Sequence, residues 1–171
     1  MKVFLVGLMA AGKTSTACEL SRRLGWQLLD CDQVVYKQTG LMRRSLLNQR
    51  GVAGLRDAEA RAFYEAISTS QPAIATIASG VFLDAKNRRT LREAAGTKVW
   101  LTATPEVLVS RLTPEDDRPW LDRDPLAVLQ KMARERNPWF EEVADLTIDS
   151  SVVSSAAAAE AVLEFIRKTP Q

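Results

Sequence analysis

Short apolar runs alternate along this chain with longer segments in which apolar residues recur every three or four positions. The short runs predict β-strands at residues 3–6, 27–31, 73–77, 98–101 and 146–148, with the strand at 73–77 buried. The periodic segments predict helices at residues 14–24, 33–38, 43–50, 54–67, 84–94, 105–112, 126–143 and 156–168, with an interruption at Pro138. Strands that alternate with helices are typical of a parallel sheet covered on both faces, so the pattern indicates an α/β fold.

The first predicted strand runs directly into a glycine-rich segment. Residues 7–14 read GLMAAGKT, which fits the pattern G-x-x-x-x-G-K-[ST] between a strand and a helix. Successive backbone N–H groups and a helix N-terminus favour the phosphates of a nucleotide in this context. The alternative, a glycine-rich turn that ends in Lys-Thr by chance, is disfavoured because position, spacing and flanking periodicity agree. The segment predicts nucleoside triphosphate binding by Gly7, Ala10, Ala11, Gly12, Lys13, Thr14 and Ser15.

The composition removes several classes of function. The chain has no histidine, which excludes Ser-His and Cys-His nucleophiles and the commonest metal ligand. With 23 basic and 21 acidic residues the net charge is only +2, so there is no electrostatic case for nucleic acid binding. Phosphoryl transfer is compatible with this composition, because it depends mainly on positioning and charge neutralisation.

The length of 171 residues predicts one domain that spans residues 1–171. No apolar run approaches the ~18–20 residues of a membrane span, so no membrane association is expected. The first predicted strand begins at residue 3, which leaves no room for a signal peptide. Cys18 and Cys31 are too few for a disulfide framework or a zinc site. Together these features predict a cytoplasmic protein.

Two carboxylates, Asp30 and Asp32, follow the second predicted strand. Ligands bind at the carboxyl ends of strands in open parallel sheets, so one carboxylate there can face a metal and the other an acceptor hydroxyl. The structural alternative is that Asp32 caps the helix predicted at residues 33–38. Beside a phosphate-binding loop, the pair favours the functional interpretation.

These motifs, in this order and spacing, resemble those of the shikimate kinases, small P-loop enzymes that transfer the γ-phosphoryl group of ATP to the 3-hydroxyl of shikimate. The resemblance extends from residue 3 to about residue 149. It includes LRDAE at residues 55–59, RPWL at 118–121 and ERNPWFEEVA at 135–144. It implies a three-layer P-loop kinase fold whose parallel five-stranded sheet has the order 2-3-1-4-5. It also implies ATP and Mg²⁺ as cofactors and a place in aromatic amino acid biosynthesis.

The resemblance implies a role for each motif residue. Thr14 and Asp30 would hold Mg²⁺, with Asp30 acting through water. Asp32 would bind the acceptor hydroxyl and act as the base. A guanidinium pairs bidentately with a carboxylate, so Arg56, oriented by Glu59, and Arg136 would hold the carboxylate of shikimate. The resemblance thus assigns catalysis to Lys13, Asp32 and Arg118, nucleotide binding to the loop with Arg111 and Arg118, and acceptor binding to Asp32, Arg56, Gly80 and Arg136.

The same resemblance implies two functional regions. A helical insertion at about residues 33–61 would bind the substrate, and a lid at about residues 113–124 would bring Arg118 onto the phosphates while Arg111 flanks the adenine. Each arginine also has a plain alternative: Arg56 and Glu59 as an ion pair on a solvated helix face, the others as surface charge. A monomer with a small-molecule substrate is expected.

The chain departs from the family pattern mainly at the acceptor. Ala78 and Ser79 stand where the family has the first two residues of a triple glycine, and Ala10 replaces a glycine in the phosphate-binding loop. The family segment M-S-I-x-E-I, aligned with residues 41–47, loses its glutamate and gains Arg43 and Arg44. Because such glycines serve backbone geometry or close ligand approach, strain or a narrowed pocket is expected at residues 78 and 79.

These departures leave three interpretations open. The chain is an active shikimate kinase with a divergent pocket, or its acceptor is a different hydroxy acid. The third possibility is a nucleotide-binding paralogue that lacks catalytic activity. Retention of Asp32, Arg56 and Arg136 favours a hydroxylated carboxylate as the acceptor, and shikimate is the preferred one.

Overall fold

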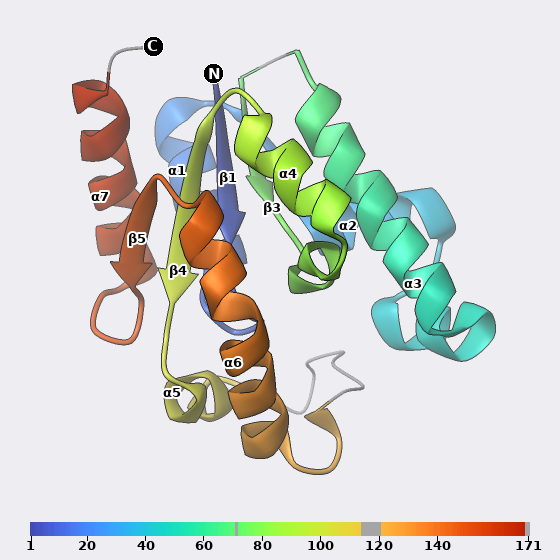
Figure 1. Ribbon diagram of the computed structural model, residues 1–171. Coiled ribbons are helices and arrows are strands. Elements are labelled where there is room, and N and C mark those ends of the chain that lie inside the picture. Colours follow the sequence, from blue (N-terminus) through green and yellow to red (C-terminus); the bar gives the residue numbers. More distant parts are fainter. Residues whose placement is uncertain (71, 114–120, 170–171) are drawn as a thin grey trace.

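A computed structural model of the chain describes residues 1–70, 72–113 and 121–169. It contains a five-stranded sheet in the order β2-β3-β1-β4-β5, and every neighbouring pair of strands is parallel (Figure 1). The strands are β1 (Lys2–Val6), β2 (Gln27–Leu29), β3 (Ala73–Thr76), β4 (Thr97–Thr102) and β5 (Leu146–Asp149). The predicted α/β class and strand order are therefore confirmed.

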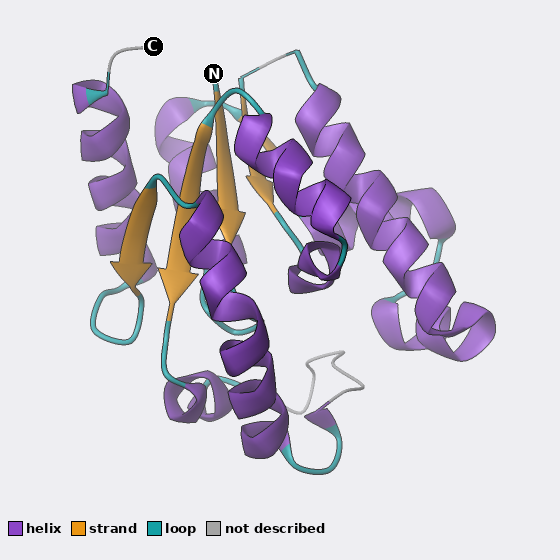
Figure 2. Ribbon diagram, viewed as in Figure 1, coloured by secondary structure: helices purple, strands orange, loops and turns teal. Residues whose placement is uncertain are grey.

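Helices cover both faces of this sheet (Figure 2). On one face α1 (Lys13–Leu24) packs with α7 (Ser155–Lys168), and on the other α4 (Ala85–Glu93) packs with α6 (Pro125–Val143). Beside the sheet, α2 (Cys31–Thr39) and α3 (Arg43–Ser68) pack against each other. The 3₁₀ helix η1 (Ser79–Leu83) follows the end of β3, and the short α5 (Pro105–Ser110) follows the end of β4.

Burial explains why such short strands form. Four consecutive residues of the central strand β1, from Val3 to Val6, are fully buried, which is typical of a parallel strand covered on both faces. At the sheet edge the pattern changes: in β5 Ile148 is buried, while Thr147 and Asp149 are exposed. Because all strands run in one direction, their carboxyl ends and the loops that follow them collect at one edge of the sheet.

Most helix boundaries agree with the sequence prediction to within two residues, and three helices differ in an informative way. Helix α2 begins at Cys31, two residues earlier than predicted, because Asp30 caps it. The two helices predicted at 43–50 and 54–67 join in α3 across a kink at Gly51. The φ of Gly51 is 66°, a backbone conformation that glycine adopts readily. Helix α6 continues through Pro138, which lies on its exposed side.

The element η1 was not predicted. It buries Val81 and Phe82, and the ring of Phe82 packs edge-on against Phe140 of α6 at 4.7 Å between ring centroids. This contact fixes the segment after β3 against α6. None of the helices in the described part of the chain is long and apolar enough to cross a membrane.

Candidate active site

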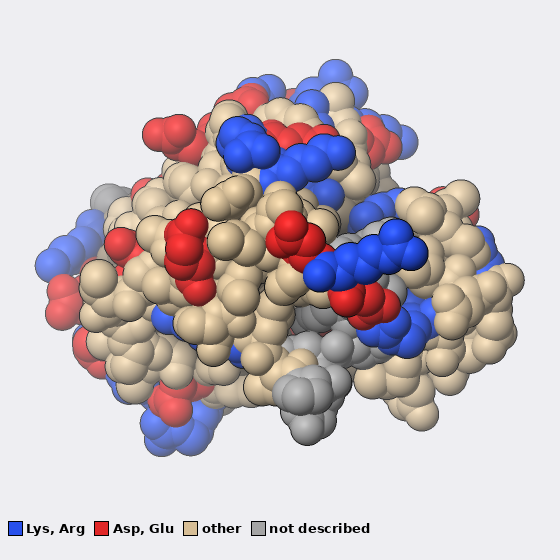
Figure 3. Space-filling model, turned by 90° about the horizontal axis from the view of Figure 1, so that it is seen from below, with Lys and Arg blue, Asp and Glu red and all other residues tan. Residues whose placement is uncertain are grey.

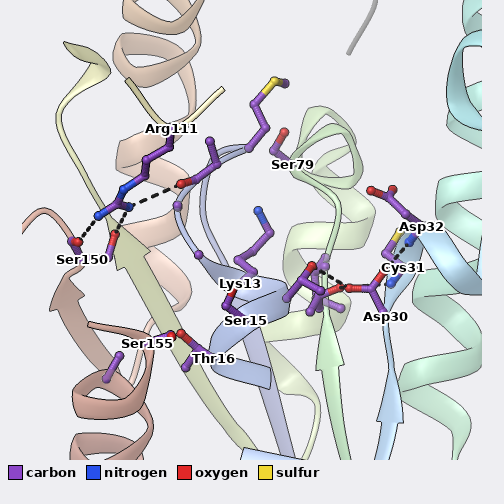
Figure 4. A pocket seen from close by; sticks show the side chains of 18 of the residues that line it. Lys13, Ser15, Thr16, Asp30, Cys31, Asp32, Ser79, Arg111, Ser150 and Ser155 are labelled. Carbon is purple, nitrogen blue, oxygen red and sulfur yellow. Dashed lines mark hydrogen bonds between the residues drawn. The ribbon is translucent and has the colours of Figure 1, made fainter. Parts of the chain in front are cut away.

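A cavity of about 460 Å³ opens at the carboxyl ends of the central strands. Its lining comes from residues far apart in the sequence: the glycine-rich loop at 9–16, residues 30–32, Arg43, residues 76–79, Arg111, Leu112, Ser150, residues 153–155 and Ala158, as Figure 4 shows in part. On the face seen from this edge in Figure 3, basic and acidic side chains are interspersed rather than gathered by sign. The volume is in the range of small-molecule sites.

Backbone geometry shapes the nucleotide side of the cavity. Gly7 has a φ of 136°, and a side chain there would meet the backbone carbonyl of Leu101 in β4. Gly12, with a φ of 86°, directly precedes α1 and contributes no side-chain cap to its first turn. The N-terminus of α1 therefore presents backbone N–H groups toward the cavity, an arrangement that binds phosphate.

Lys13 lies in the middle of the cavity, between the two clusters of polar side chains shown in Figure 4. Its Nζ donates hydrogen bonds to the carbonyl oxygens of Gly7 at 2.9 Å and Leu8 at 2.7 Å. The ammonium group is thus held over the loop in which phosphates would bind. The structure brings Lys13, Thr14 and Ser15 together with Ala10, Ala11 and Gly12 in one lining, to which Gly7 does not belong.

Asp30 joins three elements at the cavity edge. Its Oδ2 accepts hydrogen bonds from the hydroxyls of Thr14 at 2.8 Å and Thr76 at 3.1 Å, and its Oδ1 accepts from the backbone N–H groups of Asp32 and Gln33. The helix cap is therefore Asp30, so the structural alternative for Asp32 is wrong. Asp32 lies in the first turn of α2, its side chain is 46% exposed, and the residue lines the cavity.

Cys31, between the two carboxylates, is buried. Burial, and then the charge of Asp32, raise the pKa of its thiol. A protonated, buried thiol is a poor nucleophile, so the chemistry available at this edge is that of the carboxylates.

Arg111 lines the opposite side of the cavity (Figure 4). Its guanidinium donates to the hydroxyl of Ser150 at 3.2 Å, to the backbone carbonyl of Ser150, and to the carbonyl of Ala10 at 3.4 Å. Arg111 therefore connects the loop after β5 to the phosphate-binding loop. The other predicted nucleotide-binding arginine, Arg118, lies outside the described residues.

Beyond Asp32, a group of charged side chains centres on Glu59, whose side chain is only 1% exposed. One carboxylate oxygen of Glu59 accepts a hydrogen bond from Arg56 at 2.5 Å, and the other accepts from Arg43. The second terminal nitrogen of Arg43 bonds to Asp32. The predicted pairing of Arg56 with Glu59 is confirmed, and the burial of Glu59 contradicts the alternative of a solvated surface pair.

Arg136 approaches the same place from α6. Its guanidinium donates to the hydroxyl of Ser79 at 2.9 Å, while a side chain at the neighbouring Gly80 would collide with Arg56 and Glu59. Burial, and then the positive charge of Arg56, lower the pKa of Arg136. Because arginine nevertheless stays protonated, two cations are held close together at the start of η1. Gly80 is thus required where Arg56 lies against the backbone.

The predicted strain at residues 78 and 79 is absent. Ala78 has ordinary extended backbone angles of −64° and 135°, and Ala10 is the non-glycine residue with positive φ in the described part of the chain, at 62°. The residue that occupies a conformation favouring glycine is therefore in the phosphate-binding loop. At position 79 the serine hydroxyl contributes a hydrogen bond to Arg136 instead of strain.

Sequence reasoning missed several residues of the site. Thr76 and Ser150 anchor Asp30 and Arg111, and Arg43 contacts both Asp32 and Glu59, yet none of the three had an assigned role. The signal was faint: Thr76 ends an apolar strand, and Arg43 was visible only as an extra charge in a segment that departs from the family pattern.

Comparison with known proteins identifies one family. The family model for Shikimate kinase matches residues 9–167. A shikimate kinase of Dechloromonas aromatica is 34% identical over 167 residues, covering 96% of this chain and 90% of the relative. One from Xanthomonas campestris pv. campestris is 36% identical over 163 residues, covering 94% and 89%. The structure of a shikimate kinase from Acinetobacter baumannii in complex with shikimate has a TM-score of 0.90, with 29% identity, and covers 99% of this chain and 95% of that one.

Proposed function

This chain belongs to the shikimate kinase family, a family of nucleotide-using kinases, and on that premise we propose that it transfers the γ-phosphoryl group of ATP to the 3-hydroxyl of shikimate. The product would be shikimate 3-phosphate, an intermediate of aromatic amino acid biosynthesis. The substrate is a small molecule, and the relative of known structure was solved with shikimate bound.

The observation that carries the proposal is the pair of guanidinium groups at the start of η1. Arg136 bonds to Ser79, which lines the cavity, and Arg56 lies against Gly80. Within the described residues the Nε of Arg136 is buried and makes no hydrogen bond, although a carboxylate oxygen of Glu135 lies 3.7 Å from it. Two adjacent cations, of which Arg136 is buried and Arg56 is 25% exposed, favour an anion, and the planar guanidinium suits a carboxylate. The acceptor carboxylate of shikimate satisfies this requirement.

The residues of the cavity then divide between the two substrates. The N-terminus of α1 and Lys13 would hold the phosphates, and Arg111 would flank the adenine. Asp32 would accept the proton of the attacking hydroxyl, because its carboxylate lines the same cavity as Lys13. Arg118 is assigned to the transferring phosphoryl group by the family motif alone.

The site also fits Mg²⁺. This ion prefers oxygen ligands and keeps several waters, so it needs only one or two protein oxygens. Thr14 and Asp30 provide such a pair, with their oxygens 2.8 Å apart. We assign these two residues as those that would hold Mg²⁺, which when bound neutralises charge on the β- and γ-phosphates.

The remaining assignments follow from the family. Residues 33–61 would form the substrate-binding region and residues 113–124 the lid of one domain spanning residues 1–171. A cytoplasmic monomer that binds neither nucleic acid nor membrane is the expected form.

A coupled assay of ADP release from Mg-ATP, with and without shikimate, tests the proposal. The expected result is shikimate-dependent turnover with kcat of about 1–100 s⁻¹ and a product whose mass matches shikimate 3-phosphate. Nucleotide binding without shikimate-dependent turnover would contradict it. A different hydroxy-acid acceptor, or a paralogue without catalytic activity, would then be the better description.

A further inference from the structure

Arg43 is a charged side chain of the cavity to which neither the proposed reaction nor the family motifs assign a role. It is the first residue of α3, and its side chain is only 13% exposed. Within the described residues its Nε is buried without a hydrogen-bond partner. Burying a guanidinium is costly unless it is paired, so a specific reason for its position is required.

Two carboxylates provide that pairing. One terminal nitrogen of Arg43 bonds to Glu59 and the other to Asp32. Burial alone would lower the pKa of Arg43, but the charges of Asp32 and Glu59 raise it overall, so the side chain is cationic. The planar fork of arginine is suited to hold two carboxylates at a fixed separation.

These two carboxylates belong to opposite ends of the acceptor site. Asp32 is the residue proposed to take the proton of the acceptor hydroxyl, whereas Glu59 holds Arg56, which is proposed to bind the acceptor carboxylate. Asp32, Arg43, Glu59 and Arg56 therefore form one continuous series of charged hydrogen bonds. Arg43 is the member that joins the two ends.

We propose that Arg43 is a positioning residue for phosphoryl transfer, which fixes the carboxylate of Asp32 relative to the site of the acceptor carboxylate. This inference rests on the proposed function, since it concerns the roles of Asp32 and Arg56 there. Arg43 acts through Asp32, because Arg56 has its own hydrogen bond to Glu59. A base displaced by about 1 Å can lower a rate about 100-fold, so its main contribution is to kcat and not to acceptor affinity.

Steady-state kinetics of Arg43→Met and Arg43→Lys test the role, with Arg89→Met as the matched control. Arg89 is exposed on α4, outside the cavity lining. For Arg43→Met we expect kcat to fall about 10- to 100-fold, with the shikimate KM changed by less than about 3-fold. ADP affinity, measured by calorimetry, should match the wild type and confirm folding. Arg43→Lys keeps the charge but lacks the planar fork, so it should not restore kcat.

Three results would overturn the proposal: an unchanged kcat for Arg43→Met, an effect confined to KM, or full recovery of kcat in Arg43→Lys. Absence of wild-type turnover with shikimate would instead count against the proposed function. In that case a double-mutant cycle of Arg43→Met and Asp32→Ala, read by denaturant unfolding, decides the matter without an acceptor. Coupling of about 5-fold or more in the unfolding equilibrium constant supports the link between the two residues, and additive effects refute it.

Discussion

The nucleotide half and the acceptor half of the site are constructed by different means. On the nucleotide side, the site is formed mainly by backbone conformation and by a helix N-terminus. The close approach of Gly7 to β4 and the start of α1 are examples. On the acceptor side, the site is formed by charged side chains that are arranged around Glu59, namely Arg43, Arg56 and Arg136. A site formed by the backbone of one loop can be recognised from a short contiguous motif. A network of side chains cannot, because its residues are dispersed along the sequence.

Lys13→Ala is the most damaging change that we expect on the nucleotide side. Removing a cation directed at the developing charge should lower kcat by at least about 10²–10³-fold. Steady-state ADP release measures the effect, and circular dichroism controls for folding. A variant that loses only shikimate affinity would show that Lys13 belongs to the other half of the site.

Arg136→Ala is the corresponding change on the acceptor side. Loss of a charge-assisted contact of about 1.5–3 kcal/mol predicts a shikimate KM about 10- to 100-fold higher, with a much smaller effect on kcat and on the KM for ATP. Arg134→Ala, at an exposed position of the same helix, serves as the control and should behave as wild type. An equal increase in the KM for shikimate and the KM for ATP would contradict the division of the site into two halves.

Gly80→Ala tests the packing of the acceptor side more gently. The added methyl group would collide with Arg56 and Glu59, so the Arg56 side chain must move. We expect a shikimate KM about 10-fold higher with ADP affinity unchanged, since both groups that the methyl group meets, Arg56 and Glu59, lie on the acceptor side. Kinetics and calorimetry measure the two quantities, and a loss of ADP affinity would contradict the assignment.

The sequence predicted the fold well, because apolar periodicity is a local signal, and the loop motif was equally legible because it is contiguous. Even there, the helix cap was attributed to Asp32 as an alternative, while the structure assigns it to Asp30. The acceptor side was predictable only in part. Arg56 and Glu59 are close in sequence and their pairing was expected. Arg43 and Glu59, in contrast, lie on either side of the kink at Gly51, and no local sequence pattern predicts their contact.

Ser79 is a second residue whose contact could not be predicted from the sequence. Because Ser79 stands where the family motif has glycine, the sequence predicted backbone strain at this position. A glycine motif indicates which backbone conformation is required, but it does not indicate which residues a side chain there would contact. Its hydroxyl in fact bonds to Arg136, which is 57 residues away in the sequence. Such a contact depends on how η1 packs against α6, and this packing follows from the tertiary fold.

The smallest expected effects come from a pair of alanine-to-glycine changes, one in each half. Ala10 has a φ of 62°, a conformation that costs an L-residue roughly 1–2 kcal/mol, whereas Ala78 has extended angles and a buried methyl group. Ala10→Gly should therefore raise the free energy of unfolding by about 0.5–1 kcal/mol, after the entropic cost of glycine is deducted. Ala78→Gly has no strain to relieve and should lower it by about 1 kcal/mol. Denaturant unfolding of both variants measures the difference, and changes of the same sign would show that backbone strain does not distinguish the two halves.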